Sequence, residues 1–403
     1  MGRAELHAFR RKLASVEESL FVTRQPLTAG EIREALHTAP ESAAERVAEL
    51  VAVAAGSRAP ASYLEAHGAC GVLSFTTSGG RTIWRLPIET FPDHVNNVYL
   101  VLEEGAAGGM LVDAGSQLAS SRDDLARAAA VLARVHGLGD ALDTVADVVI
   151  THGHIDHYGG AGGWQARGAR IHAHELDARV LTRFDERLVT AALGLRQFLA
   201  AAGVGAVERA ELESMYLFGK SRFKPVPVDG VLVDGSRVRG AIAHHAPGHC
   251  PGQICLQVDD VLLTADHVLP RITPHQSPES ITASCGLDHY FEALARVRRV
   301  ADIRLALPGH EEPIRDMPGR VDEIVAFHRA RLHKVLGICV DEPRTVREIT
   351  QAMFGEQSGY GRILAYEEAG AHVEYLARRG KLEIVNLGDF EDHASPVLQY
   401  RAA

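Results

Sequence analysis

The chain has 403 residues, of which 46% are hydrophobic and 23% charged, a composition that excludes a disordered chain and predicts about two or three globular domains. Its formal net charge of -10 at pH 7 argues against nonspecific binding to nucleic acid or anionic lipid. The five cysteines form no C-x-x-C pair, so we expect a cytoplasmic protein without disulfides. No apolar run reaches the roughly 18 residues of a membrane span, and the N-terminus lacks the continuous apolar block of a secretory peptide, so we expect no membrane anchor.

Residues 1–82 are predicted to form a mainly helical N-terminal region. Apolar residues recur there at the spacing of one helix face, at Leu6, Phe9, Leu13, Val16 and Leu20. A later segment, LTAGEIREAL, shares the pattern T-x-x-E-I-x-x-A with RTVREITQAM near the C-terminus. The order of elements around both segments suits a helix-turn-helix with a wing, more so at the C-terminus, although a Thr with a Glu three residues later is also an ordinary capping box.

Residues 83–318 are predicted to form a layered α/β domain. Short β-branched runs such as VNNVYLVL, ADVVIT and VLLTAD alternate with turns and with helical stretches such as residues 120–136. Residues 184–218, rich in Leu and Ala, are predicted to be a helical insertion in this domain. Residues 319–403 return to helical patterns before KLEIV, so we expect a C-terminal winged-helix-like domain, which holds more acidic than basic residues.

The segment VVITHGHIDHYGG, residues 148–160, places His152, His154, Asp156 and His157 directly after an apolar, β-branched run. Imidazole and carboxylate are ligands that zinc and similar divalent metals accept. The run predicts a buried strand, and ligand crevices in α/β sheets lie at the carboxyl ends of strands. The segment therefore predicts a metal site in the loop after this strand.

Three later segments repeat this arrangement of a strand, a sharp turn and a side chain of the ligand type. HHAPGHCPGQ contains His249, LLTADHVLP contains Asp266, and IRLALPGHEEP contains His310. A single histidine of this kind is more often a surface or core residue than a ligand, but four such segments in one domain indicate a shared metal centre. The neighbouring histidines, at positions 244, 245 and 267, are expected to support the ligands or the fold.

The whole set, H-x-H-x-D-H followed by PGH, AD and a second PGH, resembles the metallo-β-lactamase superfamily, and IWRLPIETFPDHVNNVYLVL and LVDAGS are similar to that family's first strands. The resemblance implies an αββα sandwich with two divalent ions at one edge, zinc first, with manganese and iron as alternatives. It implies that one ion binds His152, His154 and His249, that the other binds Asp156, His157 and His310, and that Asp266 bridges them. Cys250 and Gln253 stand where relatives often have Thr and His, at positions that do not usually bind metal.

The implied chemistry is hydrolysis by a metal-bound hydroxide, because two ions that share a water lower its pKa toward 7. Asp156 is the expected proton shuttle, and the sequence holds no G-x-S-x-G elbow and no local cysteine nucleophile signature. The insertion and the basic run after it could bind an acyl substrate through Phe218, Lys220, Arg222 and Lys224, the alternative being buried helix faces and a solvated edge. We therefore expect a metallo-hydrolase that cleaves a thioester, ester or lactone, with an acyl-coenzyme A type of substrate favoured.

Two other functions stay open at this point. The C-terminal region is similar to that of a hydrolase subgroup that includes a mitochondrial endoribonuclease, but the acidic balance and the lack of an aromatic and basic platform argue against RNA cleavage. An iron-dependent oxidoreductase of the same fold is the other alternative, disfavoured as a single-iron enzyme because His157 and His310 are retained. We expect a small-molecule acyl partner, no nucleic-acid or membrane partner, and an oligomeric state that could include a homo-oligomer.

Overall fold

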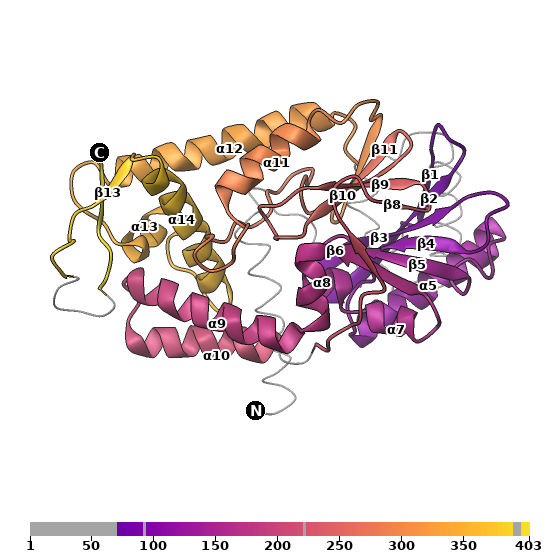
Figure 1. Ribbon diagram of the computed structural model, residues 1–403, viewed down its shortest axis with the longest axis horizontal. Coiled ribbons are helices and arrows are strands. Elements are labelled where there is room, and N and C mark those ends of the chain that lie inside the picture. Colours follow the sequence, from indigo (N-terminus) through magenta and orange to yellow (C-terminus); the bar gives the residue numbers. More distant parts are fainter. Residues whose placement is uncertain (1–70, 92–93, 221–222, 390–395) are drawn as a thin grey trace, which may run out of the picture.

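The computed structural model describes residues 71–91, 94–220, 223–389 and 396–403, and its two large sheets lie toward one end of the molecule (Figure 1). The first sheet has seven strands in chain order: β1 (Leu73–Thr76), β2 (Thr82–Phe91), β3 (His94–Leu102), β4 (Gly109–Val112), β5 (Val145–Ile150), β6 (Arg170–His174) and β7 (Gly230–Leu232). The second sheet has five, in the order β12 (Leu305–Pro308), β11 (Val261–Ala265), β10 (Ile254–Val258), β9 (Ala241–His245) and β8 (Arg237–Val238). Strands β4 to β7 run parallel, as do β11 and β12, whereas the other neighbours are antiparallel.

Alternating side chains divide the core of the sandwich into three layers. On β5, Val148 and Ile150 pack on the outer face of the first sheet, whereas Val149 packs between the sheets. On β11, Leu262 and Leu263 are divided in the same way. Helices α5 (Ala119–His136) and α7 (Ala161–Gln165) cover the first outer face, and α11 (Leu287–Val297) and α12 (Met317–Ile338) cover the second. The predicted αββα sandwich is thereby confirmed.

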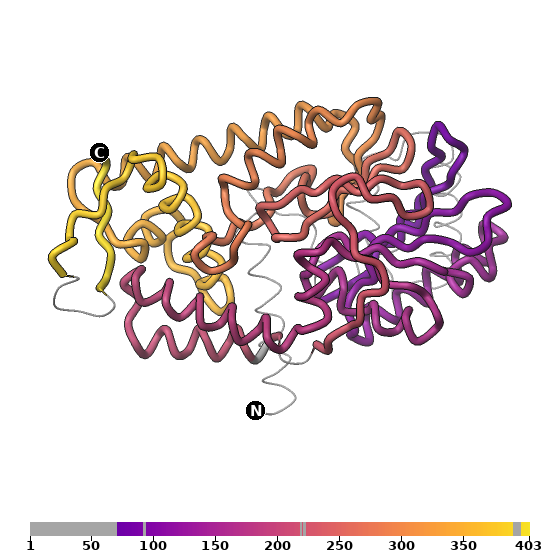
Figure 2. The backbone as a smooth tube through the Cα atoms, viewed as in Figure 1, coloured from indigo at the N-terminus to yellow at the C-terminus, as the bar shows by residue number. Residues whose placement is uncertain are grey.

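The predicted helical insertion is present and packs on the C-terminal helices. It consists of α9 (Phe184–Ala201) and α10 (Ala206–Lys220), and it follows the shorter α8 (Glu175–Thr182). Phe198 of α9 lies so close to α14 (Gly361–Arg378) that a Cβ atom on Gly370 would be 2.4 Å from its ring. Figure 2 shows the magenta insertion beside the yellow C-terminal segment, at the end of the molecule away from the first sheet. One continuous core joins the insertion, the second sheet and the C-terminal helices.

The C-terminal region contains α12, α13 (Val346–Phe354), α14 and the antiparallel strands β13 (Leu382–Ile384) and β14 (Tyr400–Ala402). Three helices followed by a two-stranded sheet match the element order of a winged helix. That this region is a winged-helix-like domain remains a prediction. The capping box predicted from RTVREITQAM is present at the start of α13. The Thr345 hydroxyl accepts from the backbone N–H of Glu348, and the Glu348 carboxylate accepts from the backbone N–H of Thr345.

The first sheet begins before the expected domain boundary at residue 83, because β1 and the first residue of β2 precede it. The sequence LSFT of β1 is short and half polar, so it carries little strand signal. The helices predicted for residues 1–70 and the LTAGEIREAL segment lie outside the described residues. In the part of the chain that is described, every cysteine is free and buried, and no helix has the length and apolarity needed to cross a membrane.

Candidate metal centre

The seven predicted metal ligands lie at one edge of the sandwich, in loops that follow the carboxyl ends of strands. Strand β5 leads to His152 and His154, β9 to His249, β11 to Asp266 and β12 to His310, and the short helix α6 (Ile155–Tyr158) carries Asp156 and His157. Gly160 lets this first loop lie against the turn after β4, since a Cβ atom at Gly160 would be 2.2 Å from the carbonyl oxygen of Ala114. The structure therefore brings together side chains that are far apart in the sequence.

The Asp266 carboxylate lies at the centre of the group. Its oxygens are 3.3 Å from Nε2 of His310, 3.4 Å from Nε2 of His157, 3.8 Å from Nε2 of His249 and 3.9 Å from Nε2 of His152. Oδ2 of Asp156 is 3.3 Å from Nε2 of His157 and 3.8 Å from Nε2 of His310. Asp266 thus contacts imidazoles of both predicted metal positions, as a bridging ligand would.

Hydrogen bonds hold the outer ring nitrogens, so that the inner nitrogens face the centre. Nδ1 of His157 donates to Asp113 at 2.8 Å, Nδ1 of His249 donates to the carbonyl oxygen of His275 at 2.8 Å, and Nδ1 of His310 donates to the carbonyl oxygen of Val95 at 2.9 Å. The Thr151 hydroxyl gives its proton to Asp113 and therefore accepts from Nδ1 of His152 at 3.1 Å. Such bonds fix the tautomer and orientation of metal-binding imidazoles.

Two buried polar atoms of this group have no hydrogen-bond partner among the described residues, namely Nε2 of His152 and Oδ1 of Asp266. A buried polar atom without a partner costs roughly 1–3 kcal/mol. Both atoms are of types that bind divalent metals, and both face the other ligands. The residues present therefore fit the metal that the donor set requires.

The charges of the group suit metal binding near neutral pH. Burial holds the pKa values of His152, His154 and His249 below the usual value, so these imidazoles are neutral. Burial by itself would raise the pKa of Asp266, but the charges of His310 and His157 lower it well below its usual range. Burial opposes a charge on His310 as well, yet Asp266 raises the pKa of that imidazole to about 9. Metal binding must release such protons.

Cys250 lies close to the predicted ligands, because ligand atoms of His152, His154, His249 and Cys250 all lie within 4.8 Å of one another. Nδ1 of His154 is 3.1 Å from Nε2 of His249, whereas Nε2 of His154 is 3.3 Å from the sulfur of Cys250. Cys250 therefore lies beside the first group of predicted ligands, at a position that the family resemblance does not assign to the metal. Burial raises the pKa of the Cys250 thiol well above its usual value, which keeps it protonated. Gln253 is fully buried and contacts the backbone of β10.

Several residues that sequence reasoning did not assign complete the site. Nε2 of His94 lies 3.2 Å from Oδ2 of Asp156, and the Asn96 amide donates to the same oxygen at 2.9 Å. Both side chains come from the start of β3, in the FPDHVNNVYLVL segment that resembled a family strand. Asp113, in the LVDAGS turn, accepts from both His157 and Thr151. The motifs were visible in the sequence, but the roles of these residues were not.

Asp177 connects two of the ligand loops. Its carboxylate accepts from the backbone N–H of Gly153 at 2.8 Å, between the first two histidine ligands, and from the backbone N–H of Gly252 at 3.0 Å, in the loop that carries His249. Asp177 is buried in α8, and a Cβ atom at Gly252 would be 2.6 Å from it. No motif or spacing marked this aspartate, because its partners are backbone groups of distant loops.

The three histidines that flank ligands do not face the centre. Nε2 of His244 is 2.9 Å from the Gln257 amide oxygen, the ring of His245 stacks on His174 at 3.9 Å, and the buried His267 ring packs on Tyr290 at 5.3 Å. Their contacts are those of structural residues.

The predicted substrate residues are only partly described. The Lys220 ammonium lies near the centre, because its charge helps to lower the pKa of His154. Burial and His249 are the larger causes of that lowering. Lys224 is exposed in the loop after α10, and the Phe218 side chain and the whole of Arg222 lie outside the described residues. Most apolar side chains of the insertion are buried in the core, among them Leu188, Leu195 and Leu199. For these three leucines, the alternative prediction, that they form the buried face of a helix, is correct.

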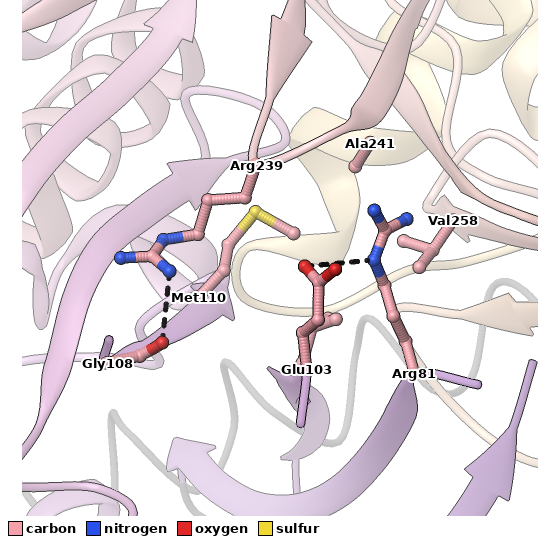
Figure 3. A pocket seen from close by; sticks show the side chains of 8 residues that line it. Arg81, Glu103, Gly108, Met110, Arg239, Ala241 and Val258 are labelled. Atoms are coloured by element: carbon pink, nitrogen blue, oxygen red, sulfur yellow. Dashed lines mark hydrogen bonds and ion pairs between the residues drawn. The ribbon is translucent and has the colours of Figure 1, made fainter. Parts of the chain in front are cut away.

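A small crevice at the opposite end of the strands is unconnected with the predicted ligands. It is lined by the end of β3 and the starts of β4 and β9, where Arg239 donates to the carbonyl oxygen of Gly108 at 3.0 Å and Arg81 pairs with Glu103 at 3.5 Å (Figure 3). It holds no histidine, and its charged groups pair with each other or with the backbone. This crevice therefore lacks the ligand types that meet at the other edge.

The family of the protein follows from this fold and site. The model of the metallo-beta-lactamase superfamily matches residues 92–326, more than half of the chain, so the chain belongs to that superfamily. Its function is accordingly of the metal-dependent hydrolase type that this superfamily generally has.

Individual relatives agree with this assignment. A metallo-beta-lactamase family protein from Thermus thermophilus is 27% identical, covers 80% of this chain and 98% of its own, and has a TM-score of 0.64. A beta-lactamase domain protein from Burkholderia ambifaria is 26% identical, covers 82% of this chain and 94% of its own, and also has a TM-score of 0.64. "Lactamase-like protein nscB" of Aspergillus fumigatus is 26% identical over 152 residues, which are 33% of this chain and 42% of that protein. This match spans less than half of the fungal protein.

Proposed function

We propose that the chain is a hydrolase with two divalent ions, preferably zinc, that cleaves a thioester, ester or lactone of a small acyl substrate. The convergence of five imidazoles and the carboxylates of Asp156 and Asp266 at one edge of the sandwich carries the proposal. Two such ions, when bound, supply a water whose pKa lies near 7 and so make a separate serine or cysteine nucleophile unnecessary. Our proposed location is the cytoplasm.

The predicted ligands have different roles. His152, His154 and His249 would hold one ion, Asp156, His157 and His310 the other, and Asp266 both. Asp156 would also carry a proton to the leaving group. Burial by itself would raise the pKa of Asp156, but the charge and hydrogen bond of His157 and the contact with His94 lower it well below its usual range. It is therefore a carboxylate at neutral pH, the form that accepts a proton.

Lys220 supports a substrate with a negative charge. Its Nζ lies 4.2 Å above the ring of Tyr216, and among the described residues no carboxylate lies within ion-pair distance of it. A lysine beside a metal centre would attract an anionic group of an entering substrate. An acyl-coenzyme A thioester has such groups, so it is the substrate that we favour. Phe218, Arg222 and Lys224, which flank Lys220 in the sequence, are the other residues that we propose for its binding.

A hydrolysis screen tests the proposal. Metal-free protein would be loaded with zinc, manganese or iron and assayed on acyl-coenzyme A thioesters, simple esters, lactones, β-lactams, phosphodiesters and RNA. We expect zinc-dependent cleavage of a thioester, ester or lactone that is lost in His152→Ala and Asp266→Asn and kept in the control Lys381→Ala, because Lys381 is exposed in the C-terminal region and has no proposed role in the site. Equal activity in Asp266→Asn would contradict the proposed centre.

RNA cleavage is the second candidate, because the C-terminal helices and two-stranded sheet have the element order of a winged helix. The same screen separates the two. RNA binding depends steeply on salt, whereas hydrolysis of a small acyl substrate does not. Salt-sensitive RNA cleavage without thioester, ester or lactone hydrolysis would replace our first proposal, and oxygen uptake by iron-loaded protein would favour an oxidoreductase.

A further inference from the structure

The predicted ligand His249 is held by a segment that lies outside its own loop. Its Nδ1 donates to the carbonyl oxygen of His275, in the connection between β11 and α11. The same connection also supports the His249 backbone, because Gly286 N–H donates to the carbonyl oxygen of Gly248 at 2.9 Å. The orientation of the His249 ring therefore depends on where the carbonyl of His275 is placed.

Helix α14 of the C-terminal region fixes that carbonyl through two consecutive glutamates. Nε2 of His275 donates to the carbonyl oxygen of Leu364 at 3.3 Å and lies 3.3 Å from Oε2 of Glu367. Because a carbonyl can only accept, Nε2 carries the proton, and the Glu367 carboxylate lies beside the same nitrogen. The backbone N–H of the next residue, Gln276, donates to Oε2 of Glu368 at 2.8 Å. Both glutamates and Gln276 are buried.

Glu368 is itself held rigidly from α12. Arg331 pairs with its Oε1 at 2.6 Å, and the buried rings of His328 and His372 lie 4.0 and 3.8 Å from the same oxygen. The two rings are also within hydrogen-bond distance of each other, at 3.3 Å. His328, Glu368 and His372 form a second group of the kind that binds metal, but Arg331 already neutralises the Glu368 carboxylate. The cluster is therefore a fixed support for Glu368.

We propose that Glu367 and Glu368 are positioning residues for His249, acting through the His275–Gln276 segment, so that the C-terminal helices help to orient a ligand of the first metal. The metal part of this inference rests on the proposed function, whereas the orientation of the His249 ring does not. If the two glutamates only stabilised the packing of α14, their substitution would lower the stability of the protein without changing the tautomer of His249 or the affinity of the site for metal.

Glu367→Ala and Glu367→Gln form the test pair, since the Gln side chain keeps a polar group beside Nε2 of His275 and the Ala side chain does not. Glu208→Gln is the matched control. Glu208 of α10 also contacts α14, through Tyr366 at 3.3 Å and Arg362 at 3.6 Å, but does not touch the 275–276 segment. Urea unfolding of metal-free samples would report any loss of stability separately.

The first readout needs no metal. It uses nitrogen-15 spectra of metal-free protein with labelled histidines, in which the His249 signal is assigned by its loss in His249→Ala. We expect the Nδ1–H tautomer of His249 in wild type, Glu367→Gln and Glu208→Gln. We expect a mixed or reversed tautomer in Glu367→Ala. The second readout is a zinc titration against a chromophoric chelator. Glu367→Ala should weaken the first site at least about tenfold, with the second site unchanged.

The outcomes separate the two proposals. An unchanged His249 tautomer in Glu367→Ala overturns the positioning role, whatever happens to stability. Zinc binding that is equal in Glu367→Ala and wild type overturns its link to the metal. If wild type binds no metal, the proposed function fails, while the tautomer still decides whether α14 orients His249.

Discussion

Asp177→Asn probes the residue that connects two ligand loops. In the native protein the Asp177 carboxylate accepts from Gly153 N–H and from Gly252 N–H. An asparagine can accept with its oxygen only, so one of the two buried N–H groups loses its partner. A buried donor without a partner costs about 1–3 kcal/mol.

An opposing effect depends on pH. Burial raises the pKa of Asp177 from 3.8 to about 6, although the hydrogen bonds from Gly252 and Gly153 lower it. Between these values the folded chain binds more protons at this site than the unfolded chain, so this carboxyl makes the fold less stable as the pH rises. The difference corresponds to about 3 kcal/mol, and asparagine, which does not titrate, removes it.

Urea unfolding of metal-free protein at about pH 4 and about pH 7 measures the result. From the lower to the higher pH, we expect the free energy of unfolding of Asp177→Asn to rise by about 3 kcal/mol relative to that of wild type. Asp229→Asn is the control, because Asp229 also accepts from a backbone N–H, that of Ile171, but is exposed. Parallel pH profiles of wild type and Asp177→Asn would refute the reasoning.

Three further changes test other parts of the account. Gly160→Ala should destabilise the protein by about 2 kcal/mol or more, because the new Cβ atom would be 2.2 Å from the carbonyl oxygen of Ala114. Gly163→Ala places its Cβ atom in open space and should stabilise α7 by up to about 1 kcal/mol. Thermal unfolding measures both changes. Thr345→Ala should cost about 1 kcal/mol through loss of the α13 cap, and Thr345→Ser should restore most of it; equal losses would contradict the capping role. Lys220→Met should raise KM for an anionic acyl substrate at least about tenfold and leave KM for a neutral analogue unchanged, and a drop in kcat alone would argue against a binding role.

Local patterns predicted much of the fold and the ligand set. The run VVIT, with Val149 facing one core and Val148 the other, predicted β5, and the strand-turn-ligand segments predicted the edge at which His152, Asp266 and His310 meet. These features depend on residues close in the sequence, where periodicity and turn chemistry are informative.

The supporting contacts could not be predicted in this way. Asp177 lies in the short helix α8 and Glu367 in α14, which is buried over most of its length. Their partners are a backbone N–H and a histidine in distant loops. His94 begins β3 without any motif of its own and meets Asp156 only after β3 has joined the first sheet. Such contacts arise from the packing of elements that the sequence places far apart, so they appear only in the folded structure.

Metal content tests the central claim most directly. Metal-free wild type and Asp266→Asn would be loaded with excess zinc, passed through a desalting column and analysed by mass spectrometry of the elements. We expect about two zinc ions per wild-type chain and fewer in Asp266→Asn, because Asp266 contacts imidazoles of both positions. No bound zinc in wild type, or the same content in both proteins, would contradict it.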